Sequence, residues 1–526
     1  MAPMPADVMT ARPDVGVRAA TLTRRASLNA LQSLLDYGGR LGVGLVVTPI
    51  VVAGLGRTLF GVWEMLNRLV SYMSAADGRP TEALRLIVAN RQAVADDATQ
   101  RRSVGAALVV WLLFLPLIAA AGAIFIWLAP TITKVAPELR TGVRAAAGLL
   151  LVGFFLTLVA GVPESVLRGM NLGYRRMGLQ ASLSVVGGLL TVVALRAGLG
   201  LVGLGGAQIG VAVITGVMFW LLAGRYVPWF GVARPGRADV TALLSMSAWL
   251  TAGEAVAKLV LACDVIILGM VLSPAVVTPY VLTGYAARTA VGLYDFTSGA
   301  AMPGLGGLIG KGERHRALAV RRELLTLSWL FVTTVGATIL CWNRSFLALW
   351  VGREHYAGPW VNLLIVLAAV QTAFIRMDAF IIDAALQPRP RVLAGAGAVA
   401  VMIALAVPLT RTLGIPGLCL GLLAGRAVQS IAYPLLVRGF LDTGDTRGGA
   451  PRAAGAVRLV VITALLFAAA LAVGQRVLAP NWAAWAAGVA LTAACCFGVA
   501  LWSGPSAETR RAVLARLRAL WPLPAR

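Results

Sequence analysis

The chain has 526 residues, of which 59% are hydrophobic and 13% are charged, and its formal net charge is +24. This apolar content exceeds what a soluble core needs, so the composition excludes an ordinary soluble globular protein. The basic residues lie mostly between long apolar runs and seldom in patches with aromatic residues, which argues against a nucleic-acid partner. The composition therefore indicates an integral membrane protein.

Fourteen transmembrane helices are predicted, because apolar runs of roughly membrane-spanning length follow one another between Arg, Pro and Gly residues. The first six cover residues 31–54, 59–73, 107–129, 145–161, 179–195 and 199–223. The next six cover residues 243–269, 277–302, 324–342, 361–386, 392–409 and 415–437, and two more cover residues 457–471 and 482–502. We expect an all-α polytopic membrane protein with two six-helix bundles and two additional C-terminal helices.

The distribution of basic residues predicts the orientation, because cytoplasmic loops retain Lys and Arg. With the N-terminus inside, 31 basic residues fall in inner segments and nine in outer segments. The first thirty residues contain no apolar core of a signal peptide. We expect both termini to be cytoplasmic and the protein to lie in the inner membrane of the cell. The predicted parts are a cytoplasmic N-terminal tail (1–30), an N-terminal six-helix bundle (31–224), a cytoplasmic linker (225–242), a C-terminal six-helix bundle (243–437), a cytoplasmic loop (438–456), two additional transmembrane helices (457–502) and a basic cytoplasmic tail (503–526).

The two bundles are predicted to be repeats of one another. Asp36 and Arg40 in the first helix recur as Glu254 and Lys258 in the seventh, at a constant offset of 218 residues. An even number of helices in each copy means that both copies enter the membrane in the same direction, related by an axis along the membrane normal. We expect the substrate site to lie between the two halves.

Six basic residues inside predicted spans are candidates for binding an anionic substrate: Arg40, Arg68, Lys258, Arg288, Arg376 and Arg426. Each charge costs about 2.5–3.5 kcal/mol at the centre of an inserted helix, so it should face a cavity or an opposite charge. In one interpretation, pairs such as Glu64 and Arg68 neutralise each other, because residues four apart share a helix face. In the other, Arg288, Arg376 and Arg426, which have no acid four residues away, leave positive charge for a diphosphate, whose oxygens suit the planar guanidinium.

Five acids are candidates for coupling transport to a H⁺ or Na⁺ gradient: Asp295, Asp264, Asp36, Glu64 and Glu254. Asp295 is the first choice because its predicted helix is rich in Thr, Tyr and Gly, which indicates a face lined by water. The alternative roles for Asp295 are a structural hydrogen bond or an ion pair with Arg288, one heptad away. We expect no other cofactor.

Other motifs carry little chemistry. The glycine-rich run 304–312 lacks the spacing of a phosphate-binding loop and is interpreted as a flexible helix end. The only histidines, His315 and His355, have no second ligand at metal-binding spacing, so neither a metal site nor hydrolytic catalysis is expected. The basic amphipathic segment 509–521 either lies on the inner leaflet or forms a solvated tail.

Short motifs in the first half carry a family resemblance. Residues 55–63 read Leu-Gly-Arg-Thr-Leu-Phe-Gly-Val-Trp, residues 72–78 read Tyr-Met-Ser-Ala-Ala-Asp-Gly, and a charged segment, 85–91, follows. This pattern resembles the Wzx-type polysaccharide flippases of the MOP superfamily, in which a Leu-Gly turn joins the first two helices and a Tyr…Asp-x-Gly region precedes a charged cytoplasmic loop. Asp77 and Gly78 are adjacent here, which departs from the family pattern.

The second half adds a similar pattern in residues 343–352 and 356–358, so the resemblance covers most of residues 29–440. It implies two bundles that open alternately to each side of the membrane and carry an undecaprenyl-diphosphate-linked sugar repeat unit. It also implies a lipid-linked oligosaccharide and the bilayer as partners, together with polysaccharide polymerase and glycosyltransferases. By position alone, the basic candidates that it carries over are Arg40, Arg68, Arg288 and Arg376.

Three other functions compete with this one. A cation or drug antiporter of the related MATE branch has the same two six-helix halves but usually needs fewer basic residues in its cavity. A lipid II flippase of peptidoglycan synthesis also fits the two extra helices. A membrane-embedded glycosyltransferase should show a long outer loop and a carboxylate or metal constellation, and the sequence predicts neither.

Overall fold

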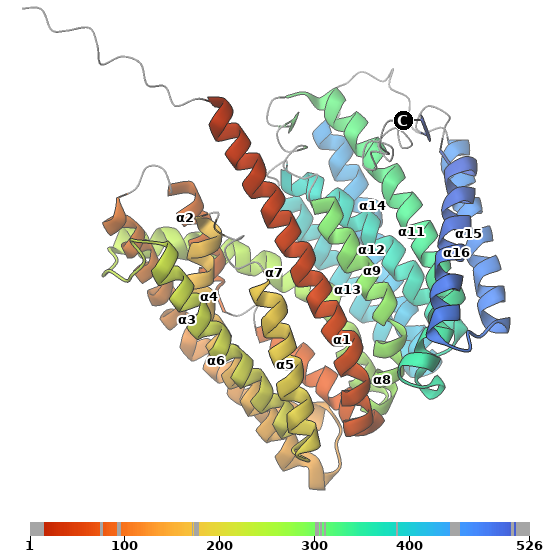
Figure 1. Ribbon diagram of the computed structural model, residues 1–526, viewed down its shortest axis with the longest axis horizontal. Helices are drawn as coiled ribbons and strands as arrows, with labels where there is room; N and C mark the ends of the chain where they lie inside the picture. Colours follow the sequence, from red (N-terminus) through yellow and green to blue (C-terminus); the bar gives the residue numbers. More distant parts are fainter. Residues whose placement is uncertain are drawn as a thin grey trace, which may run out of the picture. The chain divides into compact units, whose positions relative to one another are not determined.

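The computed structural model describes residues 15–73, 77–91, 96–170, 172, 178–299, 305, 308–309, 312–384, 388–441, 453–505 and 510–511. Within these residues the secondary structure is helical, without strands (Figure 1). The predicted glycine-rich run 304–312 and the basic segment 509–521 lie largely outside the described residues. The helices are α1 (Val15–Met73), α2 (Pro80–Arg91), α3 (Asp97–Ile132), η1 (Pro137–Leu139), α4 (Arg140–Gly169), α5 (Leu179–Arg196), α6 (Gly200–Tyr226), α7 (Arg237–Val271), α8 (Pro274–Thr283), α9 (Tyr285–Gly299), α11 (Arg314–Trp350), η3 (Arg353–His355), α12 (Pro359–Ala384), α13 (Pro388–Leu413), α14 (Ile415–Leu441), α15 (Ala453–Arg476) and α16 (Trp482–Ser503).

The prediction of an all-α polytopic membrane protein is confirmed. Eleven of the described helices are long and apolar enough to span a membrane. The difference from fourteen has three sources. One candidate span, Leu35–Met73, contains both of the first two predicted helices. The seventh, α7, is not among the eleven and carries Glu254, Lys258 and Asp264. The eighth is divided into α8 and α9, of 10 and 15 residues, which are individually too short.

The break inside α1 lies at Gly56, as the Leu-Gly turn of the sequence suggested. Its backbone angles, φ 71° and ψ 172°, are not helical and lie in a region that glycine adopts readily but other residues do not. The merged helix of 59 residues therefore consists of two helices joined at this glycine. A continuous helix from Leu35 to Met73 would be far longer than the thickness of a bilayer.

The contacts divide the chain into two compact units. Unit 1 comprises Met1–Gly54, Met73–Trp127 and Glu138–Thr251, and unit 2 comprises Leu55–Tyr72, Leu128–Pro137 and Ala252–Arg526. The chain passes from one unit to the other inside α1, α3, η1 and α7. The second part of α1, after Gly56, thus belongs to unit 2.

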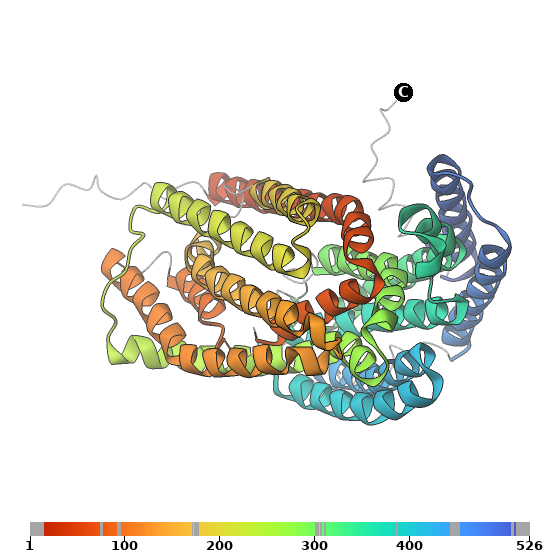
Figure 2. The same cartoon turned by 90° about the horizontal axis from the view of Figure 1, so that it is seen from below.

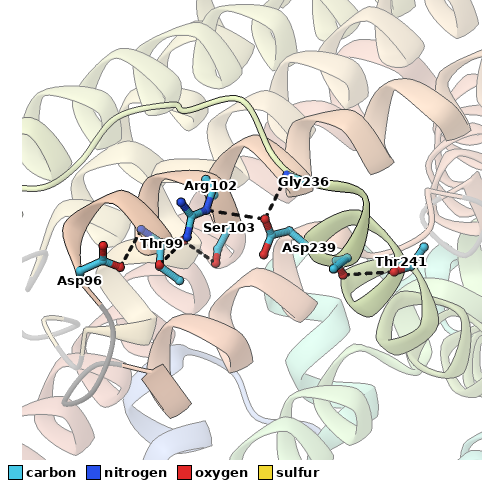
Figure 3. A network of polar contacts seen from close by, with 8 residues as sticks. Asp96, Thr99, Arg102, Ser103, Gly236, Asp239 and Thr241 are labelled. Atoms are coloured by element: carbon cyan, nitrogen blue, oxygen red, sulfur yellow. Dashed lines mark hydrogen bonds and ion pairs between the residues drawn. The ribbon is translucent and has the colours of Figure 1, made fainter.

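In unit 1, a polar clasp joins the start of α3 to the first turn of α7 (Figure 3) and to the segment between α6 and α7. The guanidinium of Arg101 donates to the carbonyl oxygen of Trp229 at 2.8 Å, and Arg102 lies 3.8 Å from the carboxylate of Asp239. A Cβ at Gly105 would lie 2.0 Å from the carbonyl oxygen of Ala233, so only glycine permits this approach. The clasp fixes the entry to α7 on unit 1.

In unit 2, α15 and α16 lie side by side against α11 (Figures 1 and 2). The indole nitrogen of Trp342 in α11 donates to Thr492 at 2.9 Å, and that of Trp329 donates to Thr463 at 3.0 Å. A Cβ at Gly488 would lie 2.2 Å from the Trp342 ring, so this glycine brings α16 into close contact with α11. The two C-terminal helices are therefore an integral part of unit 2.

The Leu-Gly-Arg motif of α1 packs on the start of α8 within unit 2. Arg57 donates through Nε to the carbonyl oxygen of Ala275 at 2.9 Å, and Thr278 donates to the carbonyl oxygen of Arg57 at 2.6 Å. Arg57 and Ala275 are separated by 218 residues, which is the offset of the predicted repeat. The superposition of the two halves remains a prediction.

Candidate functional site

Four charged side chains come together inside unit 2 and form what we call the charged cluster. Glu64 and Arg68 lie one turn apart on the second part of α1, Asp264 lies on α7 and Arg288 on α9. Glu64 interacts electrostatically with the other three, and Arg68 interacts with both Asp264 and Arg288. Residues as far apart in the sequence as Glu64 and Arg288, 224 positions, therefore contribute to one site.

Asp264 is held in a fixed position. It is 9% exposed, its Oδ2 accepts a hydrogen bond from the hydroxyl of Tyr280 at 2.8 Å, and its Oδ1 accepts from the backbone N–H of Val265 at 2.8 Å. Hydrogen bonds to a carboxylate are among the stronger ones in proteins, so both oxygens are restrained. The sequence analysis did not identify Tyr280 as a site residue, because Tyr280 lies on another helix, α8, sixteen residues from Asp264.

Arg288 folds back over the junction of α8 and α9. Its Nη2 donates to the carbonyl oxygen of Val281. Gly284, between the two helices, leaves the space for this arrangement, since a Cβ there would lie 2.8 Å from Nη1 of Arg288. The guanidinium is thus positioned by backbone groups and by the absence of a side chain at residue 284.

Arg288 and Arg376 have no acid four residues away in the sequence, but the structure places acids of other helices beside them. The acids near Arg288 are Glu64 and Asp264, which lie on other helices. Arg376 on α12 makes an ion pair with Asp295 on α9, with Nη1 and Oδ2 3.2 Å apart. The sequence analysis compared residues four apart on one helix, so it could not find either arrangement, in which the partners lie on different helices. One alternative had assigned Arg288 as the partner of Asp295, and the ion pair that the structure shows for Asp295 is with Arg376.

Arg426 on α14 differs from the other basic candidates in unit 2. Its Nη1 donates to the hydroxyl of Thr372 at 3.1 Å and lies 3.4 Å from the carbonyl oxygen of Ala368. Its buried Nε has no hydrogen-bond partner, and no carboxylate of the described residues forms an ion pair with it. Arg426 of α14 therefore contacts only neutral groups of α12 in these hydrogen bonds, and it forms no ion pair with a carboxylate of the described residues.

The remaining candidates form pairs along single helices. Lys258 lies 3.7 Å from Glu254 on α7, as expected for a neutralising pair one turn apart. Arg40 on α1 is exposed, and its Nε lies 3.3 Å from the backbone oxygen of Asp36. The proposed repeat counterparts thus make different contacts. Asp36 and Arg40 belong to unit 1, whereas Glu254 and Lys258 belong to unit 2.

Ion pairs join α12 to α9, α11 and α13. Besides Arg376 and Asp295, Asp378 accepts from Arg321 of α11 at 2.7 Å. Asp383 of α12 pairs with Arg391 of α13. The predicted helix covered residues 324–342, which left Arg321 outside it. In the structure α11 begins at Arg314, ten residues before the predicted start, because a charged segment extends the apolar helix. The described residues contain no group of three His, Cys, Asp or Glu side chains that could hold a metal.

Comparisons with known proteins agree with this architecture. A family model described as "Polysaccharide biosynthesis protein" matches residues 29–308, which is more than half of the chain. No curated protein matches. Among solved structures, the inward-facing conformation of a multidrug resistance MATE family transporter of the MOP superfamily has a TM-score of 0.62 and 16% identity, covering 77% of this chain and 98% of that one.

The outward-facing conformation of a multidrug resistance MATE family transporter has a TM-score of 0.52, with 16% identity over 79% of this chain and 93% of that one. A MATE in complex with MaD3S has the same TM-score and identity and covers 80% of this chain and 94% of that one. At this level of identity the likeness shows the fold alone. The chain belongs to the polysaccharide biosynthesis protein family and has the fold of the MATE transporters of the MOP superfamily.

Proposed function

We propose that the protein moves an undecaprenyl-diphosphate-linked oligosaccharide across the cytoplasmic membrane by alternating access. The observation that carries this proposal is the pair of arginines, Arg68 on α1 and Arg288 on α9, held within electrostatic range of each other inside unit 2. Two like charges in a medium of low dielectric repel each other strongly. Such an arrangement is useful where a ligand supplies more than one negative charge, and a diphosphate does so.

The chemistry of the guanidinium supports the same ligand. Arginine keeps its proton under nearly all conditions and offers parallel donors to phosphate oxygens. Charge-assisted hydrogen bonds of this kind are about twice as strong as neutral ones. Glu64 and Asp264 balance the two arginines while no substrate is bound, so the empty site stays close to neutral. Binding therefore exchanges internal ion contacts for contacts with the diphosphate and stays reversible.

A MATE-type antiporter of cations is the second candidate, because solved transporters of that family share the fold. The nature of the charged cluster separates the two functions. Glu64 and Asp264 offset Arg68 and Arg288 within the cluster, whereas Arg426, which forms no ion pair with a carboxylate of the described residues, adds a positive charge in the same unit that disfavours a cationic substrate. The polysaccharide family model also favours the lipid-linked anion. A lipid II flippase would use the same diphosphate chemistry.

The test is a flipping assay in proteoliposomes with a fluorescent undecaprenyl-diphosphate-linked sugar. We expect Arg68→Ala and Arg288→Ala to abolish flipping. Replacement of either arginine by lysine should give an intermediate flipping rate, because lysine keeps the positive charge but cannot donate two parallel hydrogen bonds to phosphate oxygens. Arg411→Ala, an exposed arginine at the end of α13, is the matched control and should flip normally. Normal flipping by both cluster variants, or export of a cationic dye that needs them intact, would contradict the proposal.

The location is proposed as the inner membrane, with both termini in the cytoplasm and polysaccharide polymerase and glycosyltransferases as partners. Reporter fusions after Arg102, Arg237 and Arg322 should read cytoplasmic, since Lys and Arg concentrate in these predicted inner segments. Fusions near Arg140 and Arg353 should read outside. The reverse pattern would refute the orientation. Coupling to H⁺ or Na⁺ is proposed to use the acids named above, with Asp295 first.

A further inference from the structure

The segment between α6 and α7 is folded into a fixed surface of unit 1. The chain turns directly after α6, where the backbone N–H of Phe230 donates to the carbonyl oxygen of Val227 at 2.9 Å. The ring of Phe230 then packs edge to face against Trp220 of α6, with the ring centroids 5.2 Å apart. From this turn the segment continues beside the start of α3 and enters α7 at Arg237. Its path is thus set by contacts with two helices.

Reciprocal hydrogen bonds with Arg101 of α3 hold the segment in place. The Nε of Arg101 donates to the carbonyl oxygen of Trp229 at 2.8 Å, and the backbone N–H of Ala233 donates to the carbonyl oxygen of Arg101 at 3.2 Å. At the far end, the backbone N–H of Gly236 donates to the carboxylate of Asp239 at 3.0 Å (Figure 3). The backbone between α6 and α7 is therefore restrained along its length, so its outward side chains are held in position.

The outward side chains of this segment and of its two ends carry positive charge that is not balanced. Arg225, Arg234 and Arg237 are exposed, and within the described residues none of their side chains forms an ion pair or a hydrogen bond. The nearest acid in the sequence, Asp239, is engaged by Arg102, 3.8 Å away. The dipole of a helix opposes a cation at its first residue, so Arg237 does not serve to stabilise α7. The three arginines remain free for an external anion.

Exposed apolar side chains accompany these arginines. Val232 is 55% exposed although it lies outside the candidate membrane spans, and Trp220 and Leu221 in the last two turns of α6 are 41% and 68% exposed. Charge alone would suit a soluble acidic partner as well. At the surface of a bilayer, however, aromatic and apolar side chains meet the glycerol region and the acyl chains, while guanidinium groups reach the phosphates. The combination favours a phospholipid.

We propose that the linker face, which comprises Trp220, Arg225, Val232, Arg234 and Arg237, binds the headgroup of an anionic phospholipid. The guanidinium groups donate to the phosphate oxygens in pairs of parallel hydrogen bonds. A zwitterionic headgroup offers the same phosphate, but its ammonium group repels the arginines, so the linker face prefers the anionic lipid. The bound lipid stabilises the folded segment by mass action. This lipid is a partner of unit 1 and not the transported substrate, so the inference goes beyond the proposed function.

The first test is native mass spectrometry of the full chain in detergent, titrated with phosphatidylglycerol or with phosphatidylcholine of the same acyl chains. We expect phosphatidylglycerol to bind more tightly. One arginine at an anionic lipid contributes about fivefold to the affinity, so Arg225→Gln combined with Arg234→Gln should weaken phosphatidylglycerol binding about 25-fold. Arg140→Gln combined with Arg144→Gln is the matched control, because it removes the same charge from exposed positions of α4 and should leave the affinity unchanged.

The second test locates the lipid. Phosphatidylglycerol that carries a diazirine on its glycerol headgroup is incorporated into nanodiscs of phosphatidylcholine and irradiated. We expect cross-links on the peptide of residues 226–237, and fewer of them in the double arginine variant. Val232→Ser should also reduce labelling, because it removes an apolar contact with the lipid. Soluble inorganic phosphate should not compete.

Any of the following results would overturn the proposal. Equal affinity for the two lipids would show that the linker face does not recognise the charge of the headgroup. Unchanged affinity in the double arginine variant, or cross-links only outside residues 220–237, would place the lipid elsewhere on the protein. Protection by inorganic phosphate would identify a site for a free anion, and protection by polyglutamate would identify a surface for acidic proteins. Arg237→Gln replaces the double arginine variant if that variant does not insert.

Discussion

Replacing Gly284 by alanine tests the position of Arg288 without removing any charge. The backbone at Gly284 has φ −78° and ψ −4°, which alanine adopts without strain. The new methyl would lie 2.8 Å from Nη1 and 3.2 Å from Cζ of Arg288, closer than van der Waals contact allows. The guanidinium is the flexible partner, so it must move and give up its hydrogen bond to the carbonyl oxygen of Val281.

A hydrogen bond from a charged group contributes about 1.5–3 kcal/mol, and a loss of 1.4 kcal/mol corresponds to a factor of ten. We therefore expect flipping by Gly284→Ala to fall by about tenfold or more, while the protein inserts at its normal level. The reaction of Arg288 with phenylglyoxal, followed by mass spectrometry, should become faster, because the side chain leaves its place over α8. Both quantities are measured on the same preparation of proteoliposomes.

Gly498→Ala is the matched control, because no heavy atom lies within 4 Å of the place that the new methyl would take on α16. It should flip normally and gain slightly in stability from the higher helix propensity of alanine. If Gly284→Ala flips at the normal rate, Gly284 does not position Arg288. If phenylglyoxal reactivity is unchanged while flipping is lost, the effect arises elsewhere in α8 and α9.

Two further predictions concern stability. Arg321→Ala leaves Asp378, which is 5% exposed, as a buried carboxylate without its ion pair. We therefore expect the free energy of unfolding to fall by about 3–5 kcal/mol, visible as a lower melting temperature in detergent. Arg316→Ala is the control: the Arg316 side chain is 77% exposed, so the free energy of unfolding should change by less than about 1 kcal/mol. Gly488→Leu places a side chain where Trp342 lies 2.2 Å from the ideal Cβ, so it should separate α16 from α11 and expose the region between them to protease. Equal melting or digestion of the variant and the unmodified protein would contradict the respective prediction.

The sequence predicted helices well where apolar composition decides and less well at their ends. The span around α14, residues 415–437, agrees with Ile415–Leu441 to within four residues. The start of α11 at Arg314 was not predicted, because the helix begins with a segment rich in Arg and Glu. A search for apolar runs interprets such a charged segment as a loop. The predicted helix 277–302 is divided at Gly284, where the chain leaves α8 and enters α9.

The individual charged residues of the site could be predicted from the sequence, but their assembly into one cluster could not. Intramembrane charges such as Arg68, Arg288 and Asp264 are conspicuous in apolar runs, so the sequence identified them. Their assembly depends on contacts between α1, α7 and α9, and no periodicity within one helix encodes such contacts.

The ion pairs of α12 have a consequence for biogenesis. Asp295 precedes Arg376 by 81 positions, and Arg321 precedes Asp378 by 57, so α9 and α11 are synthesised long before their partners. Until α12 arrives, each carries a charge that costs about 2.5–3.5 kcal/mol at a helix centre. The translocon must therefore retain α9 and α11, or they must remain near the interface, until α12 is made. Nascent chains that end before Pro359 should be extracted from the membrane more readily than chains that end after Ala384.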